Sequence, residues 1–394
     1  MFALAACSSA VAPSERSSPA SAPTPRSAAL SPSPTSSTAT FPSSSPSALA
    51  RAPRITWSEV PFDGYIAHII GDGTRFVAVG GDGSGASAWT SPDGMSWEQH
   101  DVPEQTFGQW PTGADITAGM DTLVRLGDTL YSFGGTATEQ FFDTSQGAGW
   151  RSTDGQAWEA IQSSSEFFRG EVMAVAASEE ALVASTVTFG GPRGTLGVWR
   201  WTPATSWVRT SLSPEIRVGA VAWADGTFLA VGSPAVPASG AQPSMWTSAD
   251  GVEWSSVAIP DGMSLCAVTS IGTRGFLAFG PVGDRIAAWT SADGATWVEG
   301  TVDHADASGT TGCGVVATDD ALVAVMQGDH NALVWTSRDG ASWDFQEELE
   351  ISGVRVGGVP LAAAGRHVLL ADTRSDPTEP DGLRQVVFVG VVEP

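Results

Sequence analysis

The sequence predicts an all-β protein, a seven-bladed β-propeller of four-stranded antiparallel blades. Three observations predict it. A hairpin motif with two tryptophans occurs six times, neighbouring copies are 43 to 61 residues apart, and no segment shows helical periodicity. Repeats of about 40 to 50 residues with strand signals are typical of propellers, in which each repeat forms one small sheet.

The hairpin motif is clearest in AWTSPDGMSW, residues 88 to 97. Its Ser-Pro-Asp-Gly stretch is typical of a type I turn, and Gly94 can take the left-handed conformation that closes a hairpin. A three-residue hairpin loop predicts that Trp89 lies directly opposite Trp97 on paired strands. The copy at 198 to 207 has proline and alanine in the turn, so we expect another turn type there. The first tryptophans of the other copies are at positions 150, 199, 246, 289 and 335.

The two ends of the chain decide the number of blades. Two strand-like segments precede each hairpin, and three more strands follow the sixth hairpin, within residues 354 to 372 and 384 to 392. Residues 55 to 62 are typical of an isolated fourth strand. If this N-terminal strand completes the last blade, the ring closes and no open sheet edge remains. Residues 54 to 394 then form seven blades.

The turn resembles the Asp-box of the sialidase and BNR-repeat propellers, whose usual form is Ser-x-Asp-x-Gly-x-Thr-Trp. In this chain Asp and Gly are adjacent. The resemblance covers the whole folded part of the chain and implies a propeller whose boxes are structural and lie on the rim opposite the active site. We therefore expect turn roles, and not metal binding, for Asp93, Gly94, Asp154, Gly155, Asp250, Gly251, Asp293, Gly294, Asp339 and Gly340.

The first residues resemble the lipobox of bacterial lipoproteins. Small residues precede Cys7, which the resemblance implies is lipidated, and residues 8–53 are rich in Ser, Pro, Ala and Thr. Such a composition cannot bury a core and is typical of a disordered tether. We expect a truncated signal at 1–7 whose natural start lies further upstream, this tether, and the propeller at 54–394. The alternative is a chance cysteine in a disordered tail.

This layout predicts a protein outside the cytoplasm, anchored to the bacterial cell membrane. No stretch approaches the roughly 20 apolar residues of a spanning helix, so the lipid would be the membrane attachment. The formal charge of -24 and the isoelectric point near 4.3 argue against nucleic acid and against electrostatic docking on anionic lipid. We interpret the acidity as a solvated surface. We expect no cofactor.

Catalytic patterns are sparse. The five histidines are scattered without metal-ligand spacing, so we predict no metal site and no catalytic residue. The resemblance implies sialidase chemistry only if three arginines and a tyrosine paired with a carboxylate converge. Arg169, Arg217 and Arg355 lie near predicted inner-strand starts, and the chain has two tyrosines, Tyr65 and Tyr131. We expect a structural role for Tyr131, which lies in a predicted second strand.

Two cysteines lie in equivalent places of neighbouring blades. Cys266 and Cys313 fall in the first halves of the predicted inner strands of the fifth and sixth blades. Adjacent inner strands bring equivalent positions together, and exported proteins meet oxidising conditions. We predict a disulfide between the two, with two free buried thiols as the alternative. Cys7 is then left for the lipid.

Long loops around the second blade point to a binding face. Aromatic residues in long polar loops on one rim would form an exposed apolar patch, typical of a ligand or partner site. The alternative is that they fold inward as a cover. We interpret the chain as a monomeric, non-catalytic binding or scaffolding propeller, with a protein or carbohydrate ligand near blades 1 to 3. The other hypotheses are a sialidase-type glycoside hydrolase and an assembly factor resembling the photosystem II assembly propeller. The candidate ligand contacts are Phe107, Trp110, Glu139, Phe141, Phe142, Phe167, Phe168 and Arg169.

Overall fold

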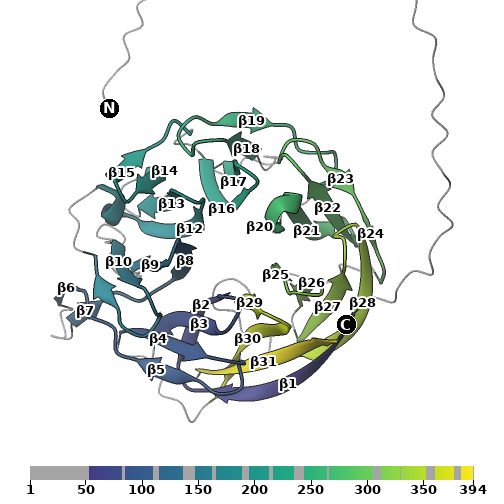
Figure 1. The fold of residues 1–394 in the computed structure, drawn as a ribbon, viewed down its shortest axis with the longest axis horizontal. Helices are drawn as coiled ribbons and strands as arrows, with labels where there is room; N and C mark the ends of the chain where they lie inside the picture. Colours follow the sequence, from purple (N-terminus) through teal and green to yellow (C-terminus); the bar gives the residue numbers. More distant parts are fainter. Residues whose placement is uncertain are drawn as a thin grey trace, which may run out of the picture. The chain divides into compact units, whose positions relative to one another are not determined.

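Seven four-stranded antiparallel sheets stand around a common centre (Figure 1). The structure is a computed structural model. It describes residues 53–81, 85–109, 115–135, 147–161, 166–188, 195–212, 216–234, 244–263, 266–304, 312–328, 330–351, 360–376 and 383–393. The innermost strand of each sheet faces the centre of the ring, so the predicted seven-bladed β-propeller is confirmed. No helix among these residues is long and apolar enough to span a membrane.

Each of the first six blades runs along the chain from its inner strand to its outer strand. Blade 1 is β2 (Tyr65–Gly71), β3 (Phe76–Gly81), β4 (Ala86–Ser91) and β5 (Glu98–His100); blade 2 is β8 (Thr122–Leu126), β9 (Thr129–Gly135), β10 (Gly147–Ser152) and β11 (Glu159–Ala160); blade 3 is β12 (Glu171–Ala177), β13 (Leu182–Thr188), β14 (Thr195–Thr202) and β15 (Thr205–Arg209). Blade 4 is β16 (Ile216–Ala224), β17 (Thr227–Pro234), β18 (Ser244–Ser248) and β19 (Ser255–Val257); blade 5 is β20 (Ala267–Ser270), β21 (Phe276–Val282), β22 (Arg285–Ser291) and β23 (Val298–Glu299); blade 6 is β25 (Gly312–Ala317), β26 (Leu322–Gln327), β27 (Asn331–Ser337) and β28 (Ser342–Glu350).

Five small elements accompany the blades. A hairpin of β6 (Thr106–Gln109) and β7 (Asp115–Thr117) precedes blade 2, and the short strand β24 (Thr301–Val302) pairs in parallel with β28. The 3-10 helices are η1 (Glu166–Arg169), before blade 3, and η2 (Gly272–Arg274), inside blade 5.

The last blade joins both ends of the propeller. It consists of β29 (Leu361–Ala364), β30 (His367–Ser375), β31 (Leu383–Glu393) and the N-terminal strand β1 (Arg54–Phe62) on the outside. Strand β1 pairs with β31 from Arg54 opposite Glu393 to Phe62 opposite Gln385. The predicted closure by the N-terminal strand is therefore confirmed, and it pairs an edge that would otherwise stay open.

The hydrophobic core is divided into seven clusters, one at each interface between neighbouring blades. The second strands contribute most to it; Phe76, Val77, Ala78 and Val79 of β3 are fully buried because both faces of β3 meet another blade. Burial of this kind on both faces requires a continuous apolar run instead of alternation. Such runs are found at the second strand of each repeat.

The tryptophan motif forms a wider turn than predicted. In the first copy Trp89 lies opposite Gln99, so the expected pairing of Trp89 with Trp97 is wrong. The Asp93 carboxylate accepts the N–H of Met95 (2.9 Å), which extends the turn. Trp97 folds over this turn, and its indole N–H donates to the Gly94 carbonyl (2.9 Å). The same indole bond to the box glycine occurs at Trp158, Trp297 and Trp343.

The box residues have the turn roles that the sequence predicts. Each of the five glycines has a positive φ of 70 to 81°. In the box of blade 4, the Gly251 N–H donates to the Ser248 hydroxyl (2.9 Å), and the Asp250 carboxylate accepts two more main-chain N–H groups. The copy at residues 198 to 207 lacks this network. Thr202 pairs with Thr205 across a two-residue turn, which confirms the expected change of turn type. The five boxes contain Asp93, Gly94, Asp154, Gly155, Asp250, Gly251, Asp293, Gly294, Asp339 and Gly340.

We expect Asp250→Ala to lower the free energy of unfolding by about 1 to 2 kcal/mol, because it leaves two turn N–H groups without their acceptor. The N–H groups of Val252 and Glu253 lower the pKa of Asp250. Its contribution is therefore present above the ordinary aspartate pKa and is lost as the pH falls through the lowered value. Urea unfolding at pH 7 measures the change, and Glu253→Ala, an exposed side chain of the same turn, is the control. Equal stability of Asp250→Ala and the wild type would contradict this role.

Candidate functional site

Four polar side chains from neighbouring blades lie where the inner strands begin. Tyr65 is the first residue of β2, Asp121 directly precedes β8, Glu171 is the first residue of β12 and Arg217 is the second of β16. These four inner strands contact one another in this order around the centre of the ring (Figure 1). All four residues are half-buried or exposed. We call them the axial cluster; they lie on the rim opposite the Ser-x-Asp-Gly turns.

The axial cluster is linked by electrostatic interactions from blade 1 to blade 4. Burial and the Asp121 charge raise the pKa of the Tyr65 phenol. Burial and the Glu171 charge raise the pKa of Asp121 to about 6. Burial also raises the pKa of Glu171, while the Arg217 charge opposes that rise. Asp121 keeps an exposed surface despite this desolvation, which fits a side chain surrounded by blades and open along the axis.

Blade 2 holds Asp121 in place. Its N–H donates to the Phe133 carbonyl (2.9 Å), and its carboxylate accepts the N–H of Gly135. A Cβ at Gly134 would lie 3.0 Å from the Asp121 carboxylate oxygen and would collide with the Gly119 carbonyl. The glycine pair at the end of β9 thus lets the carboxylate lie against the main chain. The resulting group is fixed, desolvated and partly protonated near pH 6, a combination typical of functional carboxylates.

Two of the candidate ligand contacts belong to the core. Phe167 and Phe168 in η1 are 1% and 9% exposed, so the expectation that they form an exposed patch is wrong. The ring of Phe167 stacks on Trp207 at 3.7 Å between centroids, and both phenylalanines contact Phe133. The short helix turns both rings into the interface between blades 2 and 3, which is the inward cover considered as the alternative.

The other candidate ligand contacts stay predictions. Phe107 lies in β6 and Arg169 in η1, and only their main chains are described. Four further candidates lie outside the described residues, namely Trp110, Glu139, Phe141 and Phe142.

Only part of the residue set considered for sialidase chemistry comes together within the described part of the chain: Tyr65 and Arg217 belong to the axial cluster, and the Arg169 side chain is not described. Of the three arginines, Arg217 belongs to the axial cluster and Arg355 lies outside the described residues. Tyr131 is buried against Trp201 at 5.2 Å between ring centroids, which supports a structural role. Among the described residues, no group of three or more His, Cys, Asp or Glu side chains could hold a metal ion. Sequence reasoning missed Asp121 and Glu171, which carry most of the charge of the site.

A disulfide lies at the same level on the other side of the ring. Cys266 directly precedes β20, Cys313 is the second residue of β25, and the two are bonded with their Cα atoms 5.9 Å apart. The predicted disulfide between blades 5 and 6 is therefore confirmed. At the rim where the inner strands begin, blades 1 to 4 thus present polar and charged side chains, and blades 5 and 6 are joined by a disulfide.

Comparisons with known proteins show the fold. No family model and no curated protein matches the chain. Among solved structures, YCF48 bound to D1 peptide is 14% identical over 85% of this chain and 95% of that one, with a TM-score of 0.51. A Trypanosoma rangeli sialidase in complex with 2,3-difluorosialic acid is 15% identical over 72% of this chain, with a TM-score of 0.46, and the chain spans 57% of its length. A phage phi92 endosialidase is 10% identical over 87% and 69%, with a TM-score of 0.48. At this identity the similarity to YCF48 shows a shared fold and nothing further.

Proposed function

We propose that this protein is a non-catalytic binding propeller whose ligand, a carbohydrate or a protein, contacts the axial cluster. The observation that carries the proposal is the linked row of Tyr65, Asp121, Glu171 and Arg217 on four adjacent blades. Desolvated carboxylates are costly to keep in a fold, and such groups concentrate at functional sites. Two acidic groups in a chain of charge -24 favour ligands that donate hydrogen bonds or carry positive charge, such as sugar hydroxyls or basic side chains.

The fold suits a protein ligand. YCF48, a propeller of similar fold, is bound to a peptide, so a protein ligand suits this architecture. The assembly-factor hypothesis from the sequence is one form of this proposal, in which the ligand is a protein. The axial cluster belongs to blades 1 to 4, so a ligand there would lie beside blades 1 to 3, where the sequence predicts the binding face.

We also propose that the protein works outside the cytoplasm as a lipoprotein anchored through Cys7, which lies outside the described residues. The Cys266–Cys313 disulfide supports this location, because disulfides persist in oxidising compartments and are rare in the cytosol. The lipid and the tether of residues 8–53 would hold the propeller near the membrane surface.

A glycoside hydrolase is the second candidate, and Asp121 is the observation that favours it. A carboxyl group with a pKa near 6 beside a second carboxylate, Glu171, matches the acid and base pairs of glycosidases. The raised pKa of Tyr65 keeps its phenol protonated at neutral pH, so any nucleophilic use of Tyr65 needs Asp121 as its base. The sialidase hypothesis requires three arginines, whereas the described part of the axial cluster contains one, Arg217.

Screening the full chain and its Glu171→Gln variant on a glycan array, a peptide array and a fluorogenic glycosidase panel tests the proposal. We expect binding without turnover, weakened at least tenfold in Glu171→Gln because a desolvated acceptor is lost. Glu180→Gln, an exposed side chain in the turn after β12 on the opposite rim, is the matched control. Turnover that Glu171→Gln abolishes would replace the binding role by the hydrolase. Binding that is equal in both variants would place the ligand away from the axial cluster.

A further inference from the structure

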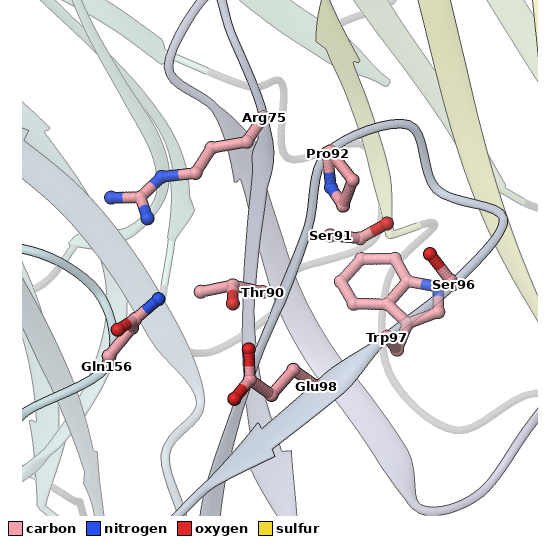
Figure 2. Close-up of a pocket in the computed structure, with 8 residues that line it drawn as sticks. All are labelled: Arg75, Thr90, Ser91, Pro92, Ser96, Trp97, Glu98 and Gln156. Carbon is pink, nitrogen blue, oxygen red and sulfur yellow. The ribbon is translucent and has the colours of Figure 1, made fainter.

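A groove lies on the opposite rim, between the box hairpin of blade 1 and the box of blade 2. Its volume is about 330 Å³. Figure 2 shows an indole and a proline ring on one side, a guanidinium and a side-chain amide on the other, and a hydroxyl and a carboxylate between them. In that order these are Trp97, Pro92, Arg75, Gln156, Thr90 and Glu98.

Trp97 on one side of the groove and Arg75 on the other are held in place by the fold. The Trp97 indole donates to the Gly94 carbonyl (2.9 Å) and meets Phe62 edge-on, with the ring centroids 5.5 Å apart. Across the groove, Arg75 donates to the Asp72 carboxylate (3.0 Å) and to the Asp154 carbonyl of blade 2 (2.7 Å). A site whose groups are already fixed loses little conformational entropy when a ligand binds.

Two polar groups of the groove, the Glu98 carboxylate and the Gln156 amide, are available, whereas the Thr90 hydroxyl already shares a hydrogen bond with His100 (2.8 Å). Within the described part of the chain, the side chains of Glu98 and Gln156 make no hydrogen bond or ion pair. The groove therefore offers a carboxylate acceptor, an amide that both donates and accepts, and the N–H groups of Arg75 that do not donate to Asp72 or Asp154. An anionic ligand would meet Glu98 and the net charge of -24, and a cationic ligand would meet Arg75. A neutral ligand with several hydroxyl groups avoids both charge conflicts and can hydrogen-bond to Glu98 and to Arg75.

We propose that this groove binds a neutral pyranose sugar, with the apolar C–H face of the ring on Trp97 and its hydroxyls on Glu98, Gln156 and Arg75. The negative face of an indole attracts the weakly positive C–H groups of such a ring, and the polar groups fix its orientation. This second site is independent of the axial cluster, since it lies on the other rim. It stands whether the axial ligand is a protein or a carbohydrate.

Fluorine NMR of the full chain labelled with 5-fluorotryptophan tests the groove. Trp97→Phe identifies the Trp97 resonance, and methyl glucoside, galactoside and mannoside are titrated separately. We expect the Trp97 resonance to move with at least one glycoside, with a Kd of about 1 mM, as suits a ligand of this size. Glu98→Gln should weaken that Kd at least fivefold. Trp297, which occupies the same box position and donates to Gly294 (3.2 Å), supplies the matched control resonance, identified with Trp297→Phe.

Three results would overturn the groove proposal. One is no movement of the Trp97 resonance with any glycoside at 10 mM; another is equal movement of the Trp297 resonance; the third is an unchanged Kd in Glu98→Gln. Tighter binding of sialic acid or glucosamine than of the neutral glycosides would overturn the choice of a neutral sugar. Glu171→Gln separates the two sites, because we expect it to leave this titration unchanged while it weakens the axial ligand.

Discussion

Asp121→Asn should stabilise the propeller and remove its axial function in the same step. We expect the free energy of unfolding at pH 8 to rise by about 1 kcal/mol, while affinity for the axial ligand falls at least tenfold. Both effects have one cause: the fold holds a carboxylate at a place that disfavours its charge, and in the proposed binding role the ligand uses that charge. A residue that weakens the fold and is kept for function is the usual sign of a site.

The expected gain in unfolding free energy follows from the raised pKa of Asp121, which is about 6 against an ordinary 3.8. The folded state binds the carboxyl proton of Asp121 more tightly than the unfolded state does. The stability that this proton contributes is fully present below pH 3.8 and is lost as the pH rises through 6. The full shift corresponds to about 3 kcal/mol. Because Asp121 keeps an exposed surface, solvent screening reduces this to about 1 kcal/mol. Asparagine has no charge to desolvate, so the variant gains most at high pH.

Urea unfolding at pH 8 and pH 4 measures the stability change, and a binding titration from pH 5 to 8 measures the functional one. We expect the advantage of Asp121→Asn to shrink at pH 4, and wild-type binding to weaken as the pH falls through 6. Asp128→Asn changes an exposed carboxylate in the β8–β9 turn and should alter neither. A variant that is less stable than the wild type at pH 8, or that keeps full affinity, would contradict the assignment.

The fold could be predicted because its signals are local and repeated. A turn of Ser, Asp and Gly between two tryptophans occurs too often in this chain to be accidental, and its spacing fixes the blade length. The register of the hairpin was predicted wrongly for a local reason as well. A sequence gives the number of residues between the strands, whereas Asp93 also accepts a main-chain N–H beyond the turn glycine and so lengthens the turn.

The axial cluster could not be predicted, because each of its members comes from a different blade. Asp121 and Glu171 stand 50 positions apart in unremarkable surroundings, and only the packing of blade 2 against blade 3 brings their strands together. The burial of Phe167 was hidden for a related reason. The copy of the motif at residues 198 to 207 has no Ser-x-Asp-Gly turn to hold its second tryptophan, Trp207. The ring of Phe167 stacks on that indole instead. A partner of this kind is visible only in three dimensions.

The double variant Cys266→Ser/Cys313→Ser should lose about 4 kcal/mol of unfolding free energy, the largest stability change that we expect. The bond closes a loop of 47 residues, and a cross-link across a loop of this length restricts the unfolded chain by about that amount. It also joins two blades at short inner strands, since β20 has only four residues. Changing both cysteines avoids leaving one free thiol.

Urea unfolding of the oxidised wild type, the reduced wild type and the double variant measures this effect. We expect the reduced wild type and the variant to unfold together, well below the oxidised protein, and Cys7→Ser to match the wild type because Cys7 lies outside the propeller strands. A difference below 1 kcal/mol would contradict the stapling role. The same measurement bears on where the protein works: a propeller that depends on this bond for several kcal/mol is fully stable only where cysteines are oxidised, which is the condition outside the cytoplasm.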